Sequence, residues 1–375
     1  MANTLTEVKD KLLAQGLMAL RRTSLTPRLV NRDIEEQAAG KGDTVNVPIP
    51  SAQTVADVTP AATPPSTQDV APTSVPIVMD RWKESAFYLT DKEQLEVMEG
   101  TIPMQASEAL EALVSEVDRY VLSLASKAYG YHGTAGTTPF TAGGVDRPTD
   151  VTKIRAVLNK QLAPLNNRHI ILDPDAEAAA LNLRAFHDMS FSGDVSAILA
   201  GMLNQKFGFQ WWMSQNVRTH TAGTMTTALV NNGAGYAAGT KTIAIDGDVG
   251  TMLVGDVISF AGHSQTYVVT EGQTGAGSIS FEPGLLVAVA DNVAITIRAT
   301  HVMNLAMHRD FIAFASRPLA GSNHPSSVIS QVVDPISGLA LRLEITREHR
   351  RDRFAYDILY GADVVRRELG ARLAG

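Results

Sequence analysis

The sequence contains no cysteine in its 375 residues. This absence excludes disulfide bridges, zinc sites built from thiolates and enzymes with a cysteine nucleophile. A chain without cysteine suits a reducing compartment such as the cytosol. The length allows about two or three domains, and the composition, 45% hydrophobic and 19% charged, is typical of a globular protein.

Long hydrophobic runs are also missing. The longest apolar segments, such as Leu285 to Ala290, are far shorter than the roughly 20 residues that a membrane-spanning helix needs. The segment Met1 to Leu25 is amphipathic and lacks the continuous apolar core and the cleavage site of a signal peptide. The sequence therefore predicts a soluble protein that is not exported by this route and has no membrane partner.

Basic residues are in the minority, and the net charge is −7. A protein that binds nucleic acid by general neutralisation of phosphates needs an excess of lysine and arginine. We therefore expect no such surface over the chain as a whole, while local basic patches remain open.

Motifs for catalysis and for metal binding are absent or incomplete. His308-Arg309-Asp310 matches the kinase catalytic triplet, but Ala315 stands where that motif needs a metal-binding asparagine. The glycines at 233–235 and 272–277 lack the lysine and the following helix of a phosphate loop. Asp246-Gly247-Asp248 lacks the ligand spacing of a calcium loop and is interpreted as a hairpin turn. Neither the zinc-protease pair of histidines nor a Gly-x-Ser-x-Gly elbow occurs, so we expect no enzyme, cofactor or metal site.

One long helix is predicted over Thr101 to Tyr129, because apolar residues recur there at helical spacing. Thr101 is a candidate cap, Pro103 fits the first turn, and Gly130 follows the end. At 1.5 Å per residue the helix would run roughly 40 Å. The opposite face carries Glu108, Glu111, Glu116, Asp118 and Arg119.

A projecting two-stranded arm is predicted before this helix. Val45, Val47 and Ile49 alternate with polar residues in a first strand, and a second strand runs from about Val75 to Leu89. Seven of the seventeen prolines lie between positions 48 and 76, in a stretch with few large side chains. An isolated ribbon of this kind is marginal in water, so a neighbouring subunit is expected to hold it. A disordered linker is the alternative. The candidate interface residues here are Pro60, Pro64, Pro65, Pro72, Arg81 and Trp82.

The rest of the first half predicts a compact α+β region. A short amphipathic helix is expected over Leu5 to Leu20, docked on its own domain or on a neighbouring subunit. After the long helix we expect a loop over Gly130 to Pro148, a helix capped by Asp150, and a buried strand at 169–172. Asp173-Pro174 begins another helix, a further helix starts near Asp194, and a strand covers 209–217. Trp211 and Trp212 are interpreted as core or interface residues, with a ligand pocket as the less favoured alternative.

An all-β insertion is predicted over Lys241 to Arg298. Short strands are separated by glycine at almost every break, which is typical of a small closed barrel or sandwich. The α+β pattern resumes at His301, and the chain then continues into two alternating strands and a short helix.

The densest charge of the chain lies at 347–353. Arg347, Arg350, Arg351 and Arg353 alternate there with Glu348 and Asp352. Because the acids are interleaved, we favour a hairpin rim that makes salt bridges within or between subunits over a DNA contact. These four arginines are further candidate interface residues.

The sequence resembles the major capsid proteins of tailed bacteriophages with the Hong Kong 97-type fold, within the subgroup that carries an inserted β-barrel. The resemblance covers nearly the whole chain. It rests on Leu29-Val30-Asn31-Arg32-Asp33, on Gly42 to Pro48, on Gly201 to Val217, on Gly255 to Gly262, on Asp357-Ile358-Leu359-Tyr360-Gly361 and on Val364-Val365-Arg366.

The resemblance implies an α+β fold with a long spine helix, an extended loop and an inserted barrel. It implies an N-terminal arm at 1–40, an extended loop at 41–90, a peripheral domain at 91–164, an axial domain at 165–221 and 300–337, the barrel at 222–299, and C-terminal strands with a helix that return to the peripheral domain at 338–375.

The implied function is a shell subunit in the virion, assembled in the cytoplasm of a bacterial host. Its implied partners are copies of itself in hexamers and pentamers, a scaffolding protein, a portal, and double-stranded DNA packaged without sequence recognition. Two alternatives remain open, an encapsulin-like bacterial compartment with the same fold and an enzyme that carries a carbohydrate-binding barrel.

Overall fold

The computed structural model describes residues 24–33, 44–50, 53, 55, 57–58, 60, 72–92, 101–141, 148–188, 203, 205–247, 249–319, 327–334 and 337–375. The expected helices at Leu5 to Leu20 and from Asp194 onward lie outside this part of the chain. The chain divides into two compact units. The first takes its described residues from Asn31–Leu113 and Ala313–Val365, and the second from Thr23–Val30, Val114–Ile312 and Arg366–Gly375.

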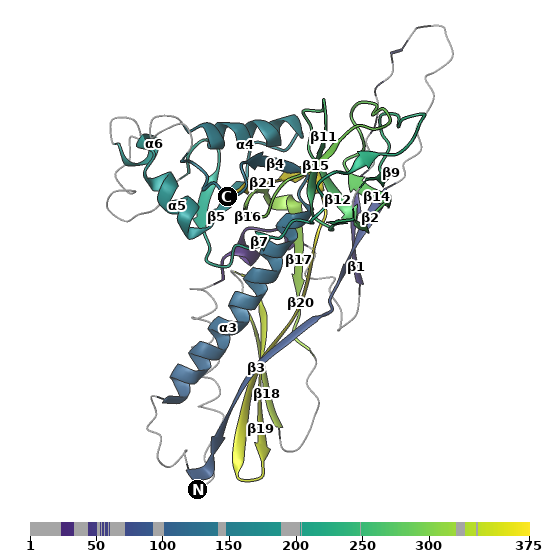
Figure 1. Ribbon diagram of the computed structural model, residues 1–375. Helices are drawn as coiled ribbons and strands as arrows, with labels where there is room; N and C mark the ends of the chain where they lie inside the picture. The colour runs from purple at the N-terminus through teal and green to yellow at the C-terminus, as the bar shows by residue number, and fades with distance from the viewer. Residues whose placement is uncertain are drawn as a thin grey trace. The chain divides into compact units, whose positions relative to one another are not determined.

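The long helix predicted from the sequence is present. It is α3, Thr101–Ser123, followed by the 3-10 turn η3, Leu124–Lys127 (Figure 1). The predicted apolar face is buried from Ala106 to Val121, while Glu108 and Glu111 are exposed. The chain leaves helical geometry at Ala128, so the helix is slightly shorter than expected.

Asp118 departs from the expected charged face, because it is buried. Its carboxylate accepts hydrogen bonds from the backbone N–H of Thr26 (3.1 Å), from the Thr26 hydroxyl (2.6 Å) and from the Leu25 N–H (3.3 Å). Burial outweighs these hydrogen bonds and raises the pKa of Asp118 to about 6. The carboxylate thereby ties the 3-10 turn η1, Thr26–Arg28, to the second half of α3.

The first unit contains a five-stranded sheet. Its order is β17-β20-β19-β18, with β3 paired to β20. The strands are β3 (Arg81–Thr90), β17 (Ile312–Ser316), β18 (Ser327–Val333), β19 (Ala340–Glu348) and β20 (Arg351–Val364). The two alternating C-terminal strands predicted from the sequence are β19 and β20, which form a hairpin.

The two faces of this sheet differ in chemistry because successive side chains of a strand point to opposite faces. Leu343 of β19 lies opposite Tyr356 of β20, and Ile345 lies opposite Phe354, all four buried. The other face carries cross-strand positions such as Arg342 opposite Asp357, with Glu84 of β3 on the far side of Asp357. One face is therefore apolar and the other is charged.

The predicted ribbon is also present. β1, Thr44–Ile49, pairs antiparallel with β2, Thr73–Val78. The single strand expected at 75–89 is instead divided at Met79 and Asp80, where the chain passes from the ribbon into β3. Val45 and Met79 pack with Ala315, Leu359 and Leu319, so the base of the ribbon is anchored in its own unit.

The second unit contains another sheet, in the order β4-β21-β16-β5-β6, with the short β7 also paired to β16. The strands are β4 (Gly130–Gly133), β5 (Arg168–Leu172), β6 (Gln210–Met213), β7 (Thr219–His220), β16 (His301–His308) and β21 (Gly370–Ala374). The helices are α4 (Thr149–Lys160), α5 (Pro174–Leu181) and α6 (Arg184–His187), and the 3-10 turns are η4 (Arg309–Phe311) and η5 (Arg367–Leu369).

Several local expectations in this unit were wrong. The loop expected over Gly130 to Pro148 begins with the strand β4, and the strand expected at 209–217 is the shorter β6. Asp150 does not cap α4, because its carboxylate accepts the N–H of Phe140 instead. The expected short C-terminal helix is the 3-10 turn η5, and the strand β21 after it was not predicted. In contrast, Asp173 caps α5 as expected, accepting the Asp175 N–H at 3.2 Å.

The insertion is a closed barrel. Its strands follow the order β15-β11-β12-β14-β9-β8. Backbone hydrogen bonds from Val230 to Val293 (3.0 Å) and from Ile295 to Ala228 (2.9 Å) join the first strand to the last. The strands are β8 (Leu229–Val230), β9 (Thr242–Asp246), β11 (Val257–Phe260), β12 (Tyr267–Glu271), β14 (Gly277–Glu282) and β15 (Ile295–Ile297), with a small pair formed by β10 (Thr251–Met252) and β13 (Gln273–Thr274).

The barrel interior is filled by its own side chains. Phe260, Tyr267 and Phe281 pack ring against ring, with centroids 5.3–5.6 Å apart. Aliphatic residues such as Ile243 and Ile279 complete this buried core. The expected small barrel is therefore confirmed, and its core is hydrophobic.

Candidate assembly interface

The ribbon residues proposed as contacts are only partly described by the structure. Pro60 and Pro72 are exposed, whereas Pro64 and Pro65 lie outside the described residues. Arg81 is exposed at the start of β3 and lies 3.7 Å from the Asp80 carboxylate. These exposed residues are available to a neighbouring molecule.

Trp82 takes part in a contact that sequence reasoning missed. Its indole N–H donates to the Asp357 carboxylate at 2.8 Å, and the Arg342 guanidinium lies 5.9 Å from its ring centroid. Arg342 Nε also donates to Asp357 at 2.9 Å, and both members of this ion pair are buried. The hydrogen bonds to Asp357 raise the pKa of Arg342. Trp82 therefore covers a buried ion pair while 44% of it remains exposed.

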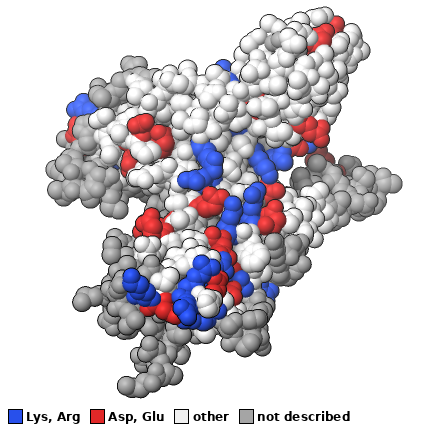
Figure 2. Space-filling model, turned by 60° about the horizontal axis from the view of Figure 1, so that its bottom comes forward, with Lys and Arg blue, Asp and Glu red and all other residues white. Residues whose placement is uncertain are grey.

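Three of the four predicted arginines form ion pairs within their own sheet. Arg347 bonds Asp352 at 2.9 Å and also reaches Asp91, and Arg351 bonds Glu348 at 2.6 Å. Arg353 pairs with Glu84 of β3, and Arg351 stacks on the Tyr88 ring with its guanidinium 4.3 Å from the centroid. Figure 2 shows acidic and basic side chains intermixed on the side of the molecule that it draws. The salt-bridged rim expected from the sequence is thus formed within one chain.

Arg350 differs from these three arginines. It lies in the two-residue turn between β19 and β20 with a φ of 56°, in the left-handed region that favours glycine. Its side chain is exposed, and within the described chain it has no ion-pair partner. Its carbonyl accepts the Asp91 N–H at 3.2 Å, which fixes the turn to the end of β3. Beside it is an open hollow of about 570 Å³ lined by Thr90, Asp91, Lys92, His349, Arg350 and Arg351.

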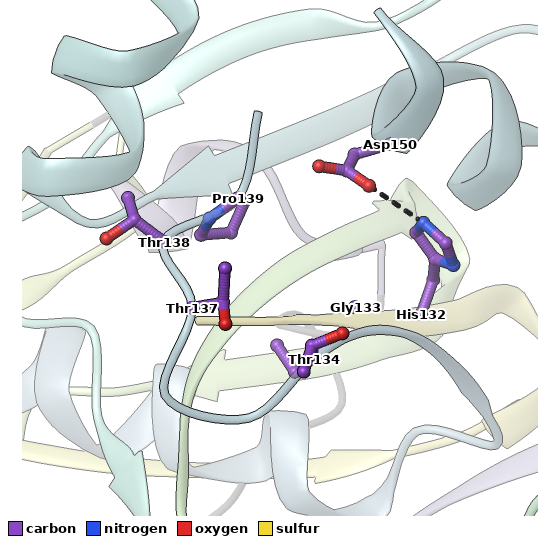
Figure 3. A pocket seen from close by; sticks show the side chains of 8 residues that line it. His132, Gly133, Thr134, Thr137, Thr138, Pro139 and Asp150 are labelled. Carbon is purple, nitrogen blue, oxygen red and sulfur yellow. Dashed lines mark hydrogen bonds and ion pairs between the residues drawn. The ribbon is translucent and has the colours of Figure 1, made fainter. Parts of the chain in front are cut away.

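A second, smaller pocket of about 110 Å³ lies between β4 and the start of α4. Figure 3 shows His132 turned toward Asp150, and their Nε2 and Oδ1 atoms are 3.0 Å apart. This contact is the main cause that lowers the pKa of Asp150. Thr134, Thr137 and Thr138 line the same pocket, but no hydrogen bond joins any of these described hydroxyls to the imidazole. The pocket therefore contains an imidazole–carboxylate pair without an activated nucleophile.

Other residues considered for chemistry have structural contacts. Trp211 is buried, donates to the Lys206 carbonyl at 3.2 Å and packs edge-on against Phe186, as expected for a core residue. His308 of the kinase-like triplet accepts the Asp310 N–H at 3.2 Å and so caps η4.

Metal and membrane features were also sought in the described residues. They contain no group of three or more histidine, cysteine or acidic side chains placed to hold a metal ion. Of the helices that the structure describes, none is both long and apolar enough to cross a bilayer.

No family model and no curated protein matches the sequence. Solved structures do match it. They include Mycobacterium phage Che8, with a TM-score of 0.52 and 16% identity over 93% of this chain and 90% of that chain. They also include the capsid structure of cyanophage P-SCSP1u, with a TM-score of 0.53 and 10% identity over 94% of this chain and 88% of that chain. At such identities the likeness shows the fold, which is the Hong Kong 97-type fold. Membership of the barrel-carrying subgroup stays a prediction.

Proposed function

We propose that this chain is the major capsid protein of a tailed phage, a structural subunit that assembles with copies of itself into an icosahedral shell around double-stranded DNA. The observation that carries the proposal is a fold match over 94% of the chain to a solved phage capsid structure. The two-stranded ribbon and the strained turn at Arg350 support it, because both place exposed side chains where a second copy can contact them.

The turn at Arg350 is the candidate contact between subunits that single substitutions test most directly. A non-glycine residue in left-handed geometry costs about 1 kcal/mol. Among the described residues Arg350 has no ion-pair partner and its side chain is exposed, so its guanidinium is accessible to an external carboxylate or phosphate. We assign it to a carboxylate of a second copy, because assembly from copies of one chain brings such groups to the exposed turn and arginine binds a carboxylate through two parallel hydrogen bonds.

The other partners and the location extend the same proposal. Copies would form hexamers and pentamers, a scaffolding protein and a portal would direct assembly, and the virion would contain the finished shell. The seven-part division of the chain into arm, loop, peripheral, axial and barrel segments belongs to the proposal as well. An encapsulin-like compartment is the second candidate, because it shares the fold, and a cargo protein encoded beside it would distinguish it.

The direct test is assembly of the purified full chain, alone and together with the scaffolding protein encoded beside it. Size-exclusion chromatography and negative-stain microscopy should show closed shells built from many weak contacts. A small oligomer that turns over a substrate would contradict the proposal.

Arg350→Gly tests the contact itself. The free energy of unfolding should stay within about 1 kcal/mol, because relief of the left-handed strain offsets the greater backbone freedom of glycine. The protein concentration needed for assembly should rise about tenfold, which corresponds to about 1.4 kcal/mol. Sedimentation measures assembly, and urea denaturation measures stability.

Arg350→Lys is the matched control, because it keeps both the positive charge and the strained backbone. It should assemble better than Arg350→Gly, and the difference should shrink at high salt. If the glycine variant assembled as well as the unchanged protein, Arg350 would not be part of the interface.

A further inference from the structure

The barrel joins the sheet of the second unit through a short neck. The chain enters the insertion from β7 and returns through β16, and these two strands pair with each other, with His220 directly opposite His301. The two chain segments that connect the barrel to the sheet therefore lie side by side. We define the neck by His220, Asp256, His301 and Arg372, together with Tyr131, whose ring contacts His301.

Asp256 is the acidic group of the neck, and it is fully buried. Its carboxylate accepts the backbone N–H of Leu253 at 2.7 Å and of Gly223 at 3.1 Å, and its Oδ1 lies 2.8 Å from His220 Nε2. Gly223 allows this close approach, since a Cβ there would lie 2.2 Å from the Thr251 carbonyl oxygen. The barrel turn around Asp256 is thus fastened to β7.

Arg372 supplies a second fastening from β21. Its side chain is fully buried, and Nη1 donates to the carbonyl of Gly255 at 2.8 Å while Nη2 donates to the carbonyl of Ser126. Burial lowers the pKa of Arg372 to about 10, so it remains charged at neutral pH. A permanent buried cation therefore lies beside the barrel turn.

His301 is one of three members of the neck with a buried polar atom that lacks a hydrogen-bond partner in the described chain, the others being Arg372 at Nε and Tyr131 at its hydroxyl. Its Nδ1 lies 2.8 Å from the Ala299 carbonyl and so carries the proton, but its buried Nε2 has no partner. The ring packs edge-on against Tyr131 at 5.3 Å between centroids and against His220 at 5.6 Å. Arg298 lies 5.9 Å from the Tyr131 ring on the far side of this contact.

We propose that the neck is an acid-sensitive lock, in which protonation of His301 releases the barrel from the sheet. In the closed neck a second proton on His301 would add a cation next to Arg372 and to His220, and its Nε2–H would have no acceptor. Asp256 is the acidic group that faces this cluster, and its oxygens already receive three donors. When the neck opens, water can solvate the charged ring.

The direction of the pH effect follows from the difference between the pKa of His301 in the closed neck and its pKa in the open neck. Burial, with the charges of Arg372 and His220, lowers the pKa of His301 to about 4, whereas an exposed histidine titrates near 6.5. Between these values the open neck binds one proton more than the closed neck. The stability of the closed neck is therefore intact above about pH 6.5 and falls as the pH decreases toward 4.

Hydrogen exchange on the unassembled full chain tests the lock between pH 4 and 6.5. After correction for intrinsic exchange rates, the opening constant for the amide of Gly223, which donates to Asp256, should rise about tenfold per pH unit as pH falls. Amides of the barrel strands, such as Phe281, should keep their protection, which separates opening of the neck from unfolding.

His301→Asn keeps a donor for the Ala299 carbonyl but cannot titrate, so its opening constant should not change with pH. His301→Gln serves as a second non-titrating variant if the first one folds poorly. His349→Asn, at the exposed turn of the other unit, is the matched control and should keep the wild-type slope. A flat wild-type profile, or an unchanged slope in a folded His301 variant, would overturn the proposal.

Discussion

The barrel and the sheet of the first unit are stabilised in opposite ways. Only 8 of the 78 residues at 222–299 are acidic or basic, while β3, β19 and β20 carry 12 in 33 residues. The barrel closes on itself around an aromatic and aliphatic core. In the described residues the sheet ends at the edge strand β18, and its charged face is held by cross-strand ion pairs. Among the described residues the barrel is held by its own hydrophobic core, whereas the sheet is held partly by cross-strand ion pairs. We therefore expect the proposed contacts between copies to lie on the sheet.

Removing a ring from the barrel core should have the largest effect on stability. Phe281→Ala leaves a cavity next to Phe260 and Tyr267, and should lower the free energy of unfolding by about 3–5 kcal/mol. Urea denaturation followed by circular dichroism measures the loss. Val328→Ala on the exposed edge strand β18 is the control, with an expected loss below about 1 kcal/mol. Similar losses for both variants would contradict the proposed difference between the two regions.

Breaking the buried ion pair between Arg342 and Asp357 should have the second-largest effect on stability. Asp357→Asn leaves the Arg342 guanidinium buried without its counter-ion and should cost about 3 kcal/mol. The double change Arg342→Met with Asp357→Leu removes both charges and should cost less than the single change. The same denaturation experiment compares them, and a double variant less stable than Asp357→Asn would refute this account.

The exposed ion pairs of the charged face should matter least to the fold. Arg351→Gln removes both the pair with Glu348 and the stacking on Tyr88, and should cost less than about 1 kcal/mol because the side chain is about half exposed. Denaturation at low and at high salt checks this value, since screening should reduce it further. A loss as large as that of Asp357→Asn would mean that the surface charges also hold the sheet together.

The sequence predicted those elements whose signal lies within the element itself. The long helix, the ribbon, the barrel and the β19–β20 hairpin all have internal periodicity or regular breaks, and all are present. The strands β4 and β21 were missed because Gly130–Gly133 and Gly370–Ala374 are short and glycine-containing, and gain their structure only from distant partners. Pairing between segments far apart in the chain leaves no local pattern.

The residues of the candidate interface likewise divide into those that a local sequence pattern predicted and those that depend on distant parts of the chain. The cluster of arginines was visible as local charge density, but the sequence could not separate Arg350 from its neighbours, because that difference depends on a backbone angle and on pairing with Glu84 and Asp91, which lie far away in the sequence. Arg342 lies in an alternating strand, and nothing in the sequence distinguishes it from the other polar residues of that strand. Its importance comes from burial opposite Asp357, which only the register reveals.

The paired strands at the base of the barrel also bear on how such an insertion is acquired. Because His220 and His301 sit across from one another, the ends of the inserted segment are adjacent and a short turn can join them, although Arg372 of β21 would then lose its bond to the Gly255 carbonyl. The paired strands β7 and β16 therefore mark a site at which another domain with adjacent ends should be accepted.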